Sequence, residues 1–163
     1  MAEGRQMPQP TREHKLLKEH IGTWKVACTF FIDPTKPPME AEGIETIEML
    51  GPFWTRSLFK ADLGGFMIEG SATVGFDPEK GKWVSTWIDN GMPYLFYFEG
   101  DLDESVGTLE MKGKGPSPVD GSTTTYRTVE TVLGPDERTV DMYFTLPAGD
   151  EMQMFSYTYT REG

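Results

Sequence analysis

Residues 137–161, ERTVDMYFTLPAGDEMQMFSYTYTR, decide the fold class. Apolar side chains at every even position from Val140 to Leu146 alternate with more polar side chains at the odd positions between them. A period of two places the two sets on opposite faces of a β-strand. Pro147-Ala-Gly149 interrupts this run, and a second run rich in aromatic residues and threonine follows. The stretch therefore predicts two antiparallel strands joined by a short turn.

The same arrangement repeats from Thr23 onward, where clusters of Gly, Pro and Asp separate short runs rich in β-branched and aromatic residues. Ten strands are expected, at 23–32, 39–50, 53–62, 66–76, 82–89, 94–100, 107–113, 124–133, 137–146 and 151–161. Short connections make consecutive strands antiparallel neighbours, and a sheet of this size normally closes to remove its exposed edges. We therefore expect an all-β fold, an antiparallel up-and-down barrel. The alternative is a sandwich of two five-stranded sheets filled by its own side chains.

The N-terminal region differs from the rest of the chain. Residues 1–10 contain two prolines and no periodicity, so they predict a flexible tail ahead of one domain at 11–163. Thr11 can cap a short helix whose apolar face carries Leu16, Leu17, His20 and Ile21, and Gly22 ends it. Because so short a helix is marginal alone in water, we expect it to plug one end of the barrel.

Charge and cysteine content exclude several classes of protein. The 163 residues carry 26 acidic and 15 basic side chains, a net charge of −11, which argues against nucleic acid and anionic membrane as partners. No stretch between charged residues approaches the ~20 apolar residues of a membrane-spanning helix. A single cysteine, Cys28, and the lack of a basic segment followed by an apolar one predict a cytoplasmic protein.

Catalytic and metal-binding motifs are scarce. His14 and His20 are six positions apart and point about 120° apart on a helix, so they cannot share a metal, and we expect no metal and no cofactor. No Gly-x-Ser-x-Gly segment is present. An enzyme remains an alternative in which Asp89 or Glu99 faces the interior and transfers a proton, with Arg56 as an anion clamp.

The most suggestive feature is the content of 10 Phe, 6 Tyr, 4 Trp and 10 Met. A ten-stranded barrel leaves room for a ligand of modest size, and Met and aromatic side chains suit a flat or flexible apolar molecule. We therefore expect a small apolar or aromatic ligand inside the barrel. The expected lining residues are Phe30, Phe59, Phe66, Ile68, Trp87, Met142, Phe144, Phe155 and Tyr157. Two alternatives stay open: a plain filled core, and a homodimer formed through outer apolar residues such as Phe31, Met67 and Met154.

Ile21-Gly-Thr-Trp24, a Gly-x-Trp motif after a short helix, resembles the start of the calycin superfamily of lipocalins and fatty-acid-binding proteins. From about residue 12 to 161 the chain resembles the bacterial domain-of-unknown-function 1579 family. The shared residues are Glu13-His14, Leu17, Gly22-Thr-Trp24, Gly75-Phe-Asp77, Trp87-Ile-Asp89, Tyr97-Phe-Glu-Gly100 and Gly115-Pro-Ser-Pro118.

The resemblance implies a calycin-like barrel with no assigned activity. It also implies that Arg161, in the last strand, covers Trp24 and closes the barrel floor, as an arginine does in lipocalins. Nitrobindins, which begin with a similar Gly-x-Trp motif, ligate haem iron through a histidine near the C-terminus. This chain has no histidine after His20.

Overall fold

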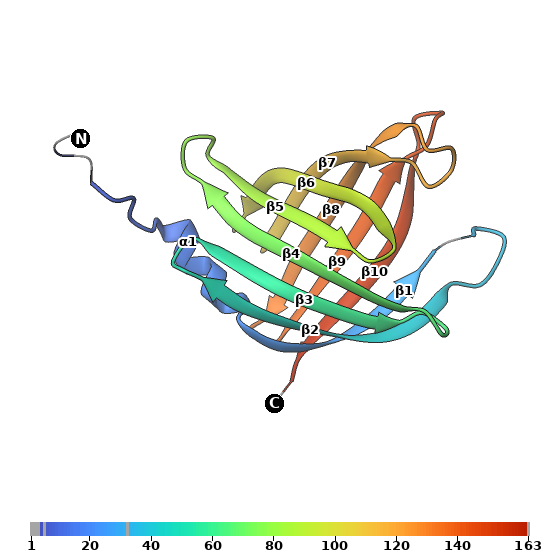
Figure 1. Ribbon diagram of the computed structural model, residues 1–163, viewed down its shortest axis with the longest axis horizontal. Coiled ribbons are helices and arrows are strands. Elements are labelled where there is room, and N and C mark those ends of the chain that lie inside the picture. The colour runs from blue at the N-terminus through green and yellow to red at the C-terminus, as the bar shows by residue number, and fades with distance from the viewer. Residues whose placement is uncertain (1–3, 5, 32, 163) are drawn as a thin grey trace.

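The computed structural model describes residues 4, 6–31 and 33–162, and it is a closed antiparallel barrel (Figure 1). Its ten strands are β1 (Gly22–Phe30), β2 (Met39–Leu50), β3 (Trp54–Asp62), β4 (Met67–Asp77), β5 (Lys82–Asp89), β6 (Met92–Asp103), β7 (Thr108–Pro116), β8 (Thr123–Gly134), β9 (Glu137–Thr145) and β10 (Glu151–Arg161). Each strand pairs with the next along the chain, and β1 closes the barrel by pairing with both β2 and β10. The expected up-and-down barrel is confirmed, and the sandwich is excluded.

Strand boundaries lie within two residues of the expected ones except in β6 and β7, which extend three residues beyond their expected ends. Gly115 and Pro116 were expected in a turn, but they pair with Thr124 and Thr123 of β8. Gly115 stays in the strand because the ring of Phe96 packs across it, where a Cβ atom would overlap the ring. The glycine therefore serves close packing inside the sheet and does not mark the end of a strand.

The face of each strand that points inward is set by Trp24, Val26 and Cys28, which are almost fully buried in β1 while Lys25 and Ala27 between them are exposed. Buried side chains gather in two clusters inside the barrel. One lies under β5–β9 and contains Leu17, Trp83, Phe96, Phe98, Leu109, Met111, Tyr126 and Phe144. The other lies under β1–β3 and β10 and contains Trp24, Val26, Cys28, Ile47, Phe59, Ala61 and Tyr159.

The helix covers the end of the barrel where β1 begins (Figure 1). It is one turn of α-helix, α1 (Arg12–Leu16), continued by a 3₁₀ turn, η1 (Leu17–His20). Leu17 is buried in the first cluster, and His14 Nε2 lies 2.9 Å from the carbonyl oxygen of Phe76 in β4. These contacts show the predicted plug. Among the described residues, no helix has the length and hydropathy needed to cross a membrane.

The predicted flexible tail falls partly on residues 1–3 and 5, which lie outside the described residues. Residues 6–10 have no helix or strand, and the division at residue 10 stays a prediction.

Candidate functional site

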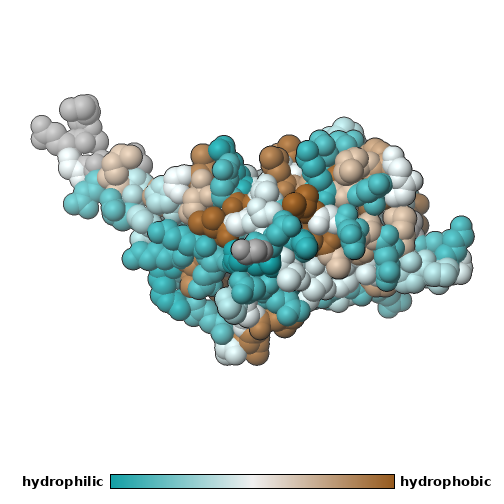
Figure 2. Space-filling view, turned by 90° about the horizontal axis from the view of Figure 1, so that it is seen from below, coloured by the Kyte–Doolittle hydropathy of each residue, from teal (hydrophilic) through white to brown (hydrophobic). Residues whose placement is uncertain are grey.

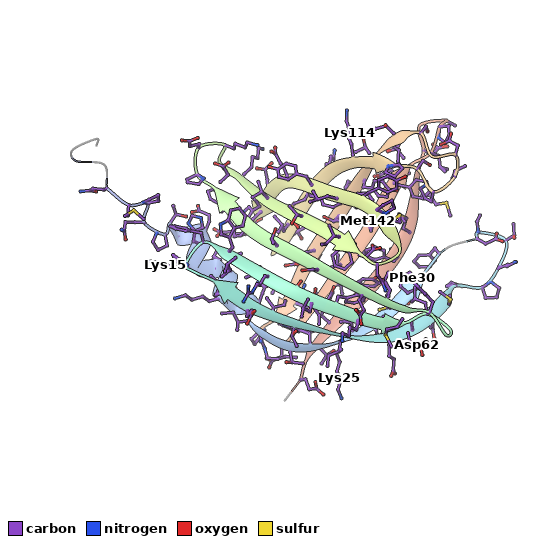
Figure 3. The ribbon with its side chains drawn as sticks, in the orientation of Figure 1. Lys15, Lys25, Phe30, Asp62, Lys114 and Met142 are labelled. Atoms are coloured by element: carbon purple, nitrogen blue, oxygen red, sulfur yellow. The ribbon has the colours of Figure 1, made fainter. Side chains whose placement is uncertain are left out.

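Several side chains face the barrel interior and yet remain partly exposed. They lie on five strands and are Phe30, Ile68, Ala72, Trp87, Val140, Met142, Phe155 and Tyr157. They lie on the inward faces of their strands, so their exposure is on the interior side of the sheet. We call this set the chamber. Figure 3 labels Phe30 on β1 and Met142 on β9, and it shows Lys25 and Lys114 extending away from the barrel.

Aromatic rings form an ordered wall of the chamber. The rings of Phe155 and Tyr157 stack with centroids 4.0 Å apart, and Phe59 continues the stack 5.5 Å beyond Tyr157 at an interplanar angle of 12°. Phe30 meets Tyr157 edge-on at 5.7 Å, and Trp87 meets Phe59 edge-on at 6.1 Å. A stack of parallel rings with edge-on neighbours offers a flat ligand both offset-stacked and T-shaped contacts.

Trp87 is held in a fixed position between the two buried clusters and contacts both. Its ring lies against Gly70 of β4, where a Cβ atom would overlap the indole. The indole Nε1–H donates to Asp89 Oδ2 at 2.8 Å, and Asp89 Oδ1 accepts the backbone N–H of Gly91 at 2.8 Å. The glycine and the carboxylate together fix the orientation of the largest ring in the chamber.

Below the chamber, toward the helix, the interior contains charged groups, and we call this set the floor. Arg138 of β9 donates to Glu130 Oε2 of β8 at 3.1 Å and to Glu45 Oε2 of β2 at 3.2 Å. Glu130 Oε1 lies 2.7 Å from His20 Nε2. The guanidinium carbon of Arg138 lies 3.8 Å from the centroid of the Tyr159 ring and 4.9 Å from that of Trp24.

The two floor glutamates differ in ionisation. Burial alone would raise the pKa of Glu130, but the nearby charges of His20 and Arg138 outweigh it and lower the pKa to about 2. Burial raises the pKa of Glu45 above its ordinary value, and Arg138 offsets only part of this rise. Glu130 is therefore the permanent partner of Arg138, whereas Glu45 is a carboxyl group whose charge is costly.

Three buried polar atoms in the described part of the chain lack a hydrogen-bond partner: Ser57 Oγ, Arg138 Nε and His20 Nδ1. Such atoms are uncommon in folded proteins, and each calls for a water, an ion or a ligand. All three belong to the floor or lie beside it, because Ser57 is a diagonal neighbour of Glu45 on the inner face of β3.

Arg161 lies over the Trp24 ring, with its guanidinium carbon 4.2 Å from the ring centroid. It also donates to the carbonyl oxygens of Glu19, at 2.7 Å, and Ile21, which join the plug to the last strand. Trp24 Nε1–H donates to the carbonyl oxygen of His20 at 2.9 Å. The geometry is the one that the calycin resemblance implies.

Comparison with known proteins places this barrel in a family. The model of a protein family of unknown function, DUF1579, matches residues 9–161. The chain belongs to this family. Among curated proteins none is similar enough to match.

Two solved structures share the fold of this DUF1579 chain at 11% sequence identity. Rv2717c from M. tuberculosis superposes with a TM-score of 0.72, covering 95% of this chain and 100% of that one. An S-type phycobiliprotein lyase from Guillardia theta superposes with a TM-score of 0.63, covering 94% of this chain and 99% of that one. At this identity the likeness establishes the barrel fold.

The structure divides the predicted lining residues of the DUF1579 chain into three groups. Partly exposed residues in the chamber are Phe30, Ile68, Trp87, Met142, Phe155 and Tyr157. Phe59 and Phe144 point inward too, but they are buried in the clusters that support the chamber wall. Phe66 lies in the turn before β4 with half of its side chain exposed, at the rim of the barrel.

The structure corrects two residues of the enzyme alternative. Glu99 lies on the outer face of β6, where it pairs with Lys80, so it is not an interior carboxylate. Arg56 also points outward and pairs with Glu48 at 2.6 Å, so it cannot clamp an anion inside the barrel. Both errors have one cause, since a shift of one residue in the assumed strand face exchanges inside for outside. Asp89 does face inward, but both of its oxygens accept hydrogen bonds that position Trp87 and the following turn.

The three residues proposed for a dimer interface differ in whether they face outward. Met67 is outward and about half exposed, and Phe31 is partly exposed after the end of β1. Met154 packs against the interior cluster, because a β-bulge between Gln153 and Phe155 shifts the register of β10. Met154 is therefore not an outer contact residue.

Sequence reasoning missed the floor. Arg138 has the same parity as Val140, Met142 and Phe144, so a charged residue stands on the apolar face of the clearest strand in the chain. That position is a readable signal of a buried, paired charge. Glu45 shows the same signal, because it alternates with Ile47 on the inner face of β2.

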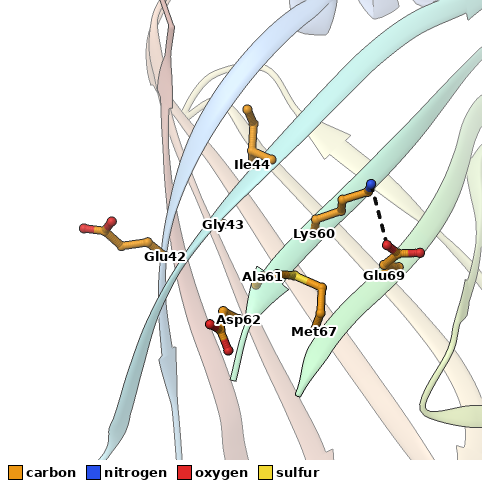
Figure 4. A pocket seen from close by; sticks show the side chains of 8 residues that line it. All are labelled: Glu42, Gly43, Ile44, Lys60, Ala61, Asp62, Met67 and Glu69. Atoms are coloured by element: carbon orange, nitrogen blue, oxygen red, sulfur yellow. Dashed lines mark ion pairs between the residues drawn. The ribbon is translucent and has the colours of Figure 1, made fainter. Parts of the chain in front are cut away.

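The hollows that the structure shows on the outer face are open, and charged side chains border both of them. One depression of about 430 Å³ lies across β2, β3 and β4 and is lined by Glu42, Gly43, Ile44, Lys60, Ala61, Asp62, Met67 and Glu69 (Figure 4). Its single lysine pairs with Glu69 at 3.6 Å. A second depression, of about 620 Å³, crosses β5–β7 and is also lined by both acidic and basic side chains. Neither resembles the apolar, ring-lined chamber.

Proposed function

We propose that this barrel binds a small, flat, apolar or aromatic molecule in its chamber. The observation that carries the proposal is that Phe30, Trp87, Met142 and Tyr157 face inward and still contact solvent. A fully packed barrel would bury these four side chains as completely as it buries Phe59. Apolar walls with a few fixed polar groups are typical of small-molecule sites.

The comparisons support the proposal only through the fold. One structural neighbour is a phycobiliprotein lyase, and at 11% sequence identity its likeness extends to the barrel fold alone. Since fold alone does not determine function, the chamber residues of this chain carry the argument.

The test is a fluorescence titration with Nile red, a flat neutral dye. We expect saturable binding at one site per chain, and we expect Ala72→Trp to weaken it at least about tenfold by filling the chamber. Ala72 is suitable because it is small, inward and partly exposed beside Trp87. Thr46→Trp, on the outer face of β2, is the matched control and should leave the affinity unchanged. Absence of saturable binding, or equal affinity in both variants, would refute the proposal.

A homodimer is the second candidate, and an outward row of apolar side chains favours it. Leu58, Ile88 and Leu95 on β3, β5 and β6 are 62%, 50% and 67% exposed. On the face that Figure 2 displays, hydrophobic side chains form separate areas among hydrophilic ones, which is ordinary for a protein surface. Light scattering at high concentration tests this candidate: a dimer that Leu58→Lys dissociates supports it, and a monomer removes it.

For location we propose the cytoplasm, because the one cysteine, Cys28, is a free buried thiol. Fractionation of the host cell tests this directly.

A further inference from the structure

We propose that Glu45 and Ser57 form the polar end of the chamber and select ligands with a positively charged or N–H-donating end. The inference rests on the proposed function and names the class of ligand: a flat aromatic molecule with a basic nitrogen, an amidine or a similar N–H group at one end.

Glu45 is in reach of the chamber. It lies on the inner face of β2 between Trp24 and Phe59, its partners on the adjacent strands. Its side chain keeps 9% of its exposure. Phe59 in turn stacks on Tyr157 of the chamber. Arg138 donates to Oε2 of Glu45, and Ser57 is the other polar neighbour that lowers the pKa of this carboxyl group.

Glu45 shares its cationic partner with a second carboxylate. Arg138 pairs with both Glu45 and Glu130, while His20 contacts Glu130 and not Glu45. A buried carboxylate that is only partly compensated by positive charge is costly, and an added cation or N–H donor lowers that cost. A ligand with a cationic or N–H-donating end supplies this charge or hydrogen bond at Glu45.

Ser57 is a second observation. Its side chain points inward from β3, and its buried hydroxyl forms no hydrogen bond of ordinary geometry, although it lies near enough to Glu45 to help lower the pKa of that carboxyl group. Its neighbour on β4 is Ala72, which belongs to the chamber. A hydroxyl can accept one N–H of the ligand while the carboxylate accepts another, so the pair can hold two N–H groups. Ser57 therefore sits where the chamber meets the floor and is available to a ligand.

The experiment compares three fluorescent aromatic probes on the full chain at 0.3 M salt: the cationic amidine p-aminobenzamidine, neutral Nile red and anionic ANS. We expect p-aminobenzamidine to bind the wild-type chain at least about tenfold more tightly than ANS. Glu45→Gln keeps the shape and removes the charge, so it should reduce this preference about tenfold while Nile red affinity changes less than twofold. Glu42→Gln removes one charge from the outer face of the same strand and is the matched control.

Each outcome decides between the two proposals. Saturable Nile red binding with no preference for p-aminobenzamidine over ANS overturns the inference and leaves the chamber as a ligand site. A preference for ANS also overturns it, because it assigns the ligand contact to the unpartnered Nε of Arg138. Equal effects of Glu42→Gln and Glu45→Gln would show attraction by net charge alone. No binding of any dye refutes the proposed function itself. If Glu45→Gln fails to fold, Ser57→Ala takes its place, because it removes the hydroxyl at the same end of the chamber and should also reduce the preference for the cationic dye; an unchanged preference overturns the inference.

Discussion

The two ends of the barrel interior use opposite chemistry. The floor buries Arg138 between Trp24 and Tyr159 and satisfies it with two carboxylates, whereas the chamber contains no buried ion pair among the described residues and leaves large rings in contact with solvent. Paired charges and aromatic rings that are fully buried hold the fold together. Partly exposed rings contribute less to stability, since burial of apolar area is what stabilises.

This difference indicates that inward residues at different positions of one strand serve either stability or ligand binding. On β9 the inward residues run from Arg138 through Met142 to Phe144, that is, from buried charge through exposed chamber to buried core. A substitution should therefore change stability or binding according to its position on one strand, even when the residue type is similar. The following predictions test that division.

The largest effect is expected in the floor. Arg138→Met leaves Glu45 buried without its cation and Glu130 with His20 alone, which should lower the free energy of unfolding by about 3–5 kcal/mol. Arg127 is the matched control, because it stacks on Tyr143 and pairs with Glu151 on the outer face. Arg127→Met should cost about 1 kcal/mol or less. Urea unfolding measures both, and similar losses would contradict the assignment of the floor.

Two truncations on β9 separate core from chamber. Phe144→Ala removes a buried ring and should cost about 3–5 kcal/mol, with Nile red affinity retained in the folded fraction. Met142→Ala removes a partly exposed side chain, so we expect a loss of about 2 kcal/mol or less and a clear loss of dye affinity. If Phe144→Ala lost dye affinity and Met142→Ala kept it, the ligand would lie in the cluster around Phe144. The distinction between a buried core and a ligand-binding chamber would then be wrong.

Much of this architecture is readable from the sequence, and the reason is physical. Alternation from Val140 to Leu146 sets both the strand and its faces, and Gly-x-Trp24 marks the first strand. Alternation within one strand does not tell which of its two faces lies on the same side of the sheet as a given face of the next strand. Asp89 and Glu99 looked equivalent until pairing placed Asp89 inside and Glu99 outside. The bulge near Met154 changes parity within one strand, and no local residue pattern announces it.

Acid should weaken the floor through Glu130. Its pKa is about 2 in the folded chain against an ordinary value of 4.5, so its stabilising contribution is complete above pH 4.5 and is lost as the pH falls toward 2. The contribution is at most about 3 kcal/mol. Glu45 acts in the opposite direction, because its raised pKa favours the folded state at low pH.

The informative quantity is thus the difference in unfolding free energy between the wild-type chain and Glu130→Gln. We expect this difference to be largest at pH 7 and to shrink between pH 4.5 and 2. A difference that is independent of pH would contradict the role of Glu130 as the ionised partner of Arg138. Glu42→Gln, on the outer face, should show no such convergence.

The smallest effect is expected where the floor meets solvent. Arg161→Lys keeps the positive charge but loses the planar fork that reaches the carbonyl oxygens of Glu19 and Ile21, so it should cost about 1–2 kcal/mol. Water can reach this side chain, which is 26% exposed, and it replaces part of what is lost. Hydrogen exchange at residues 12–21 should accelerate, because these bonds hold the plug. Arg127→Lys should leave that exchange unchanged, and a loss equal to that of Arg138→Met would show that solvent exposure does not separate the two arginines.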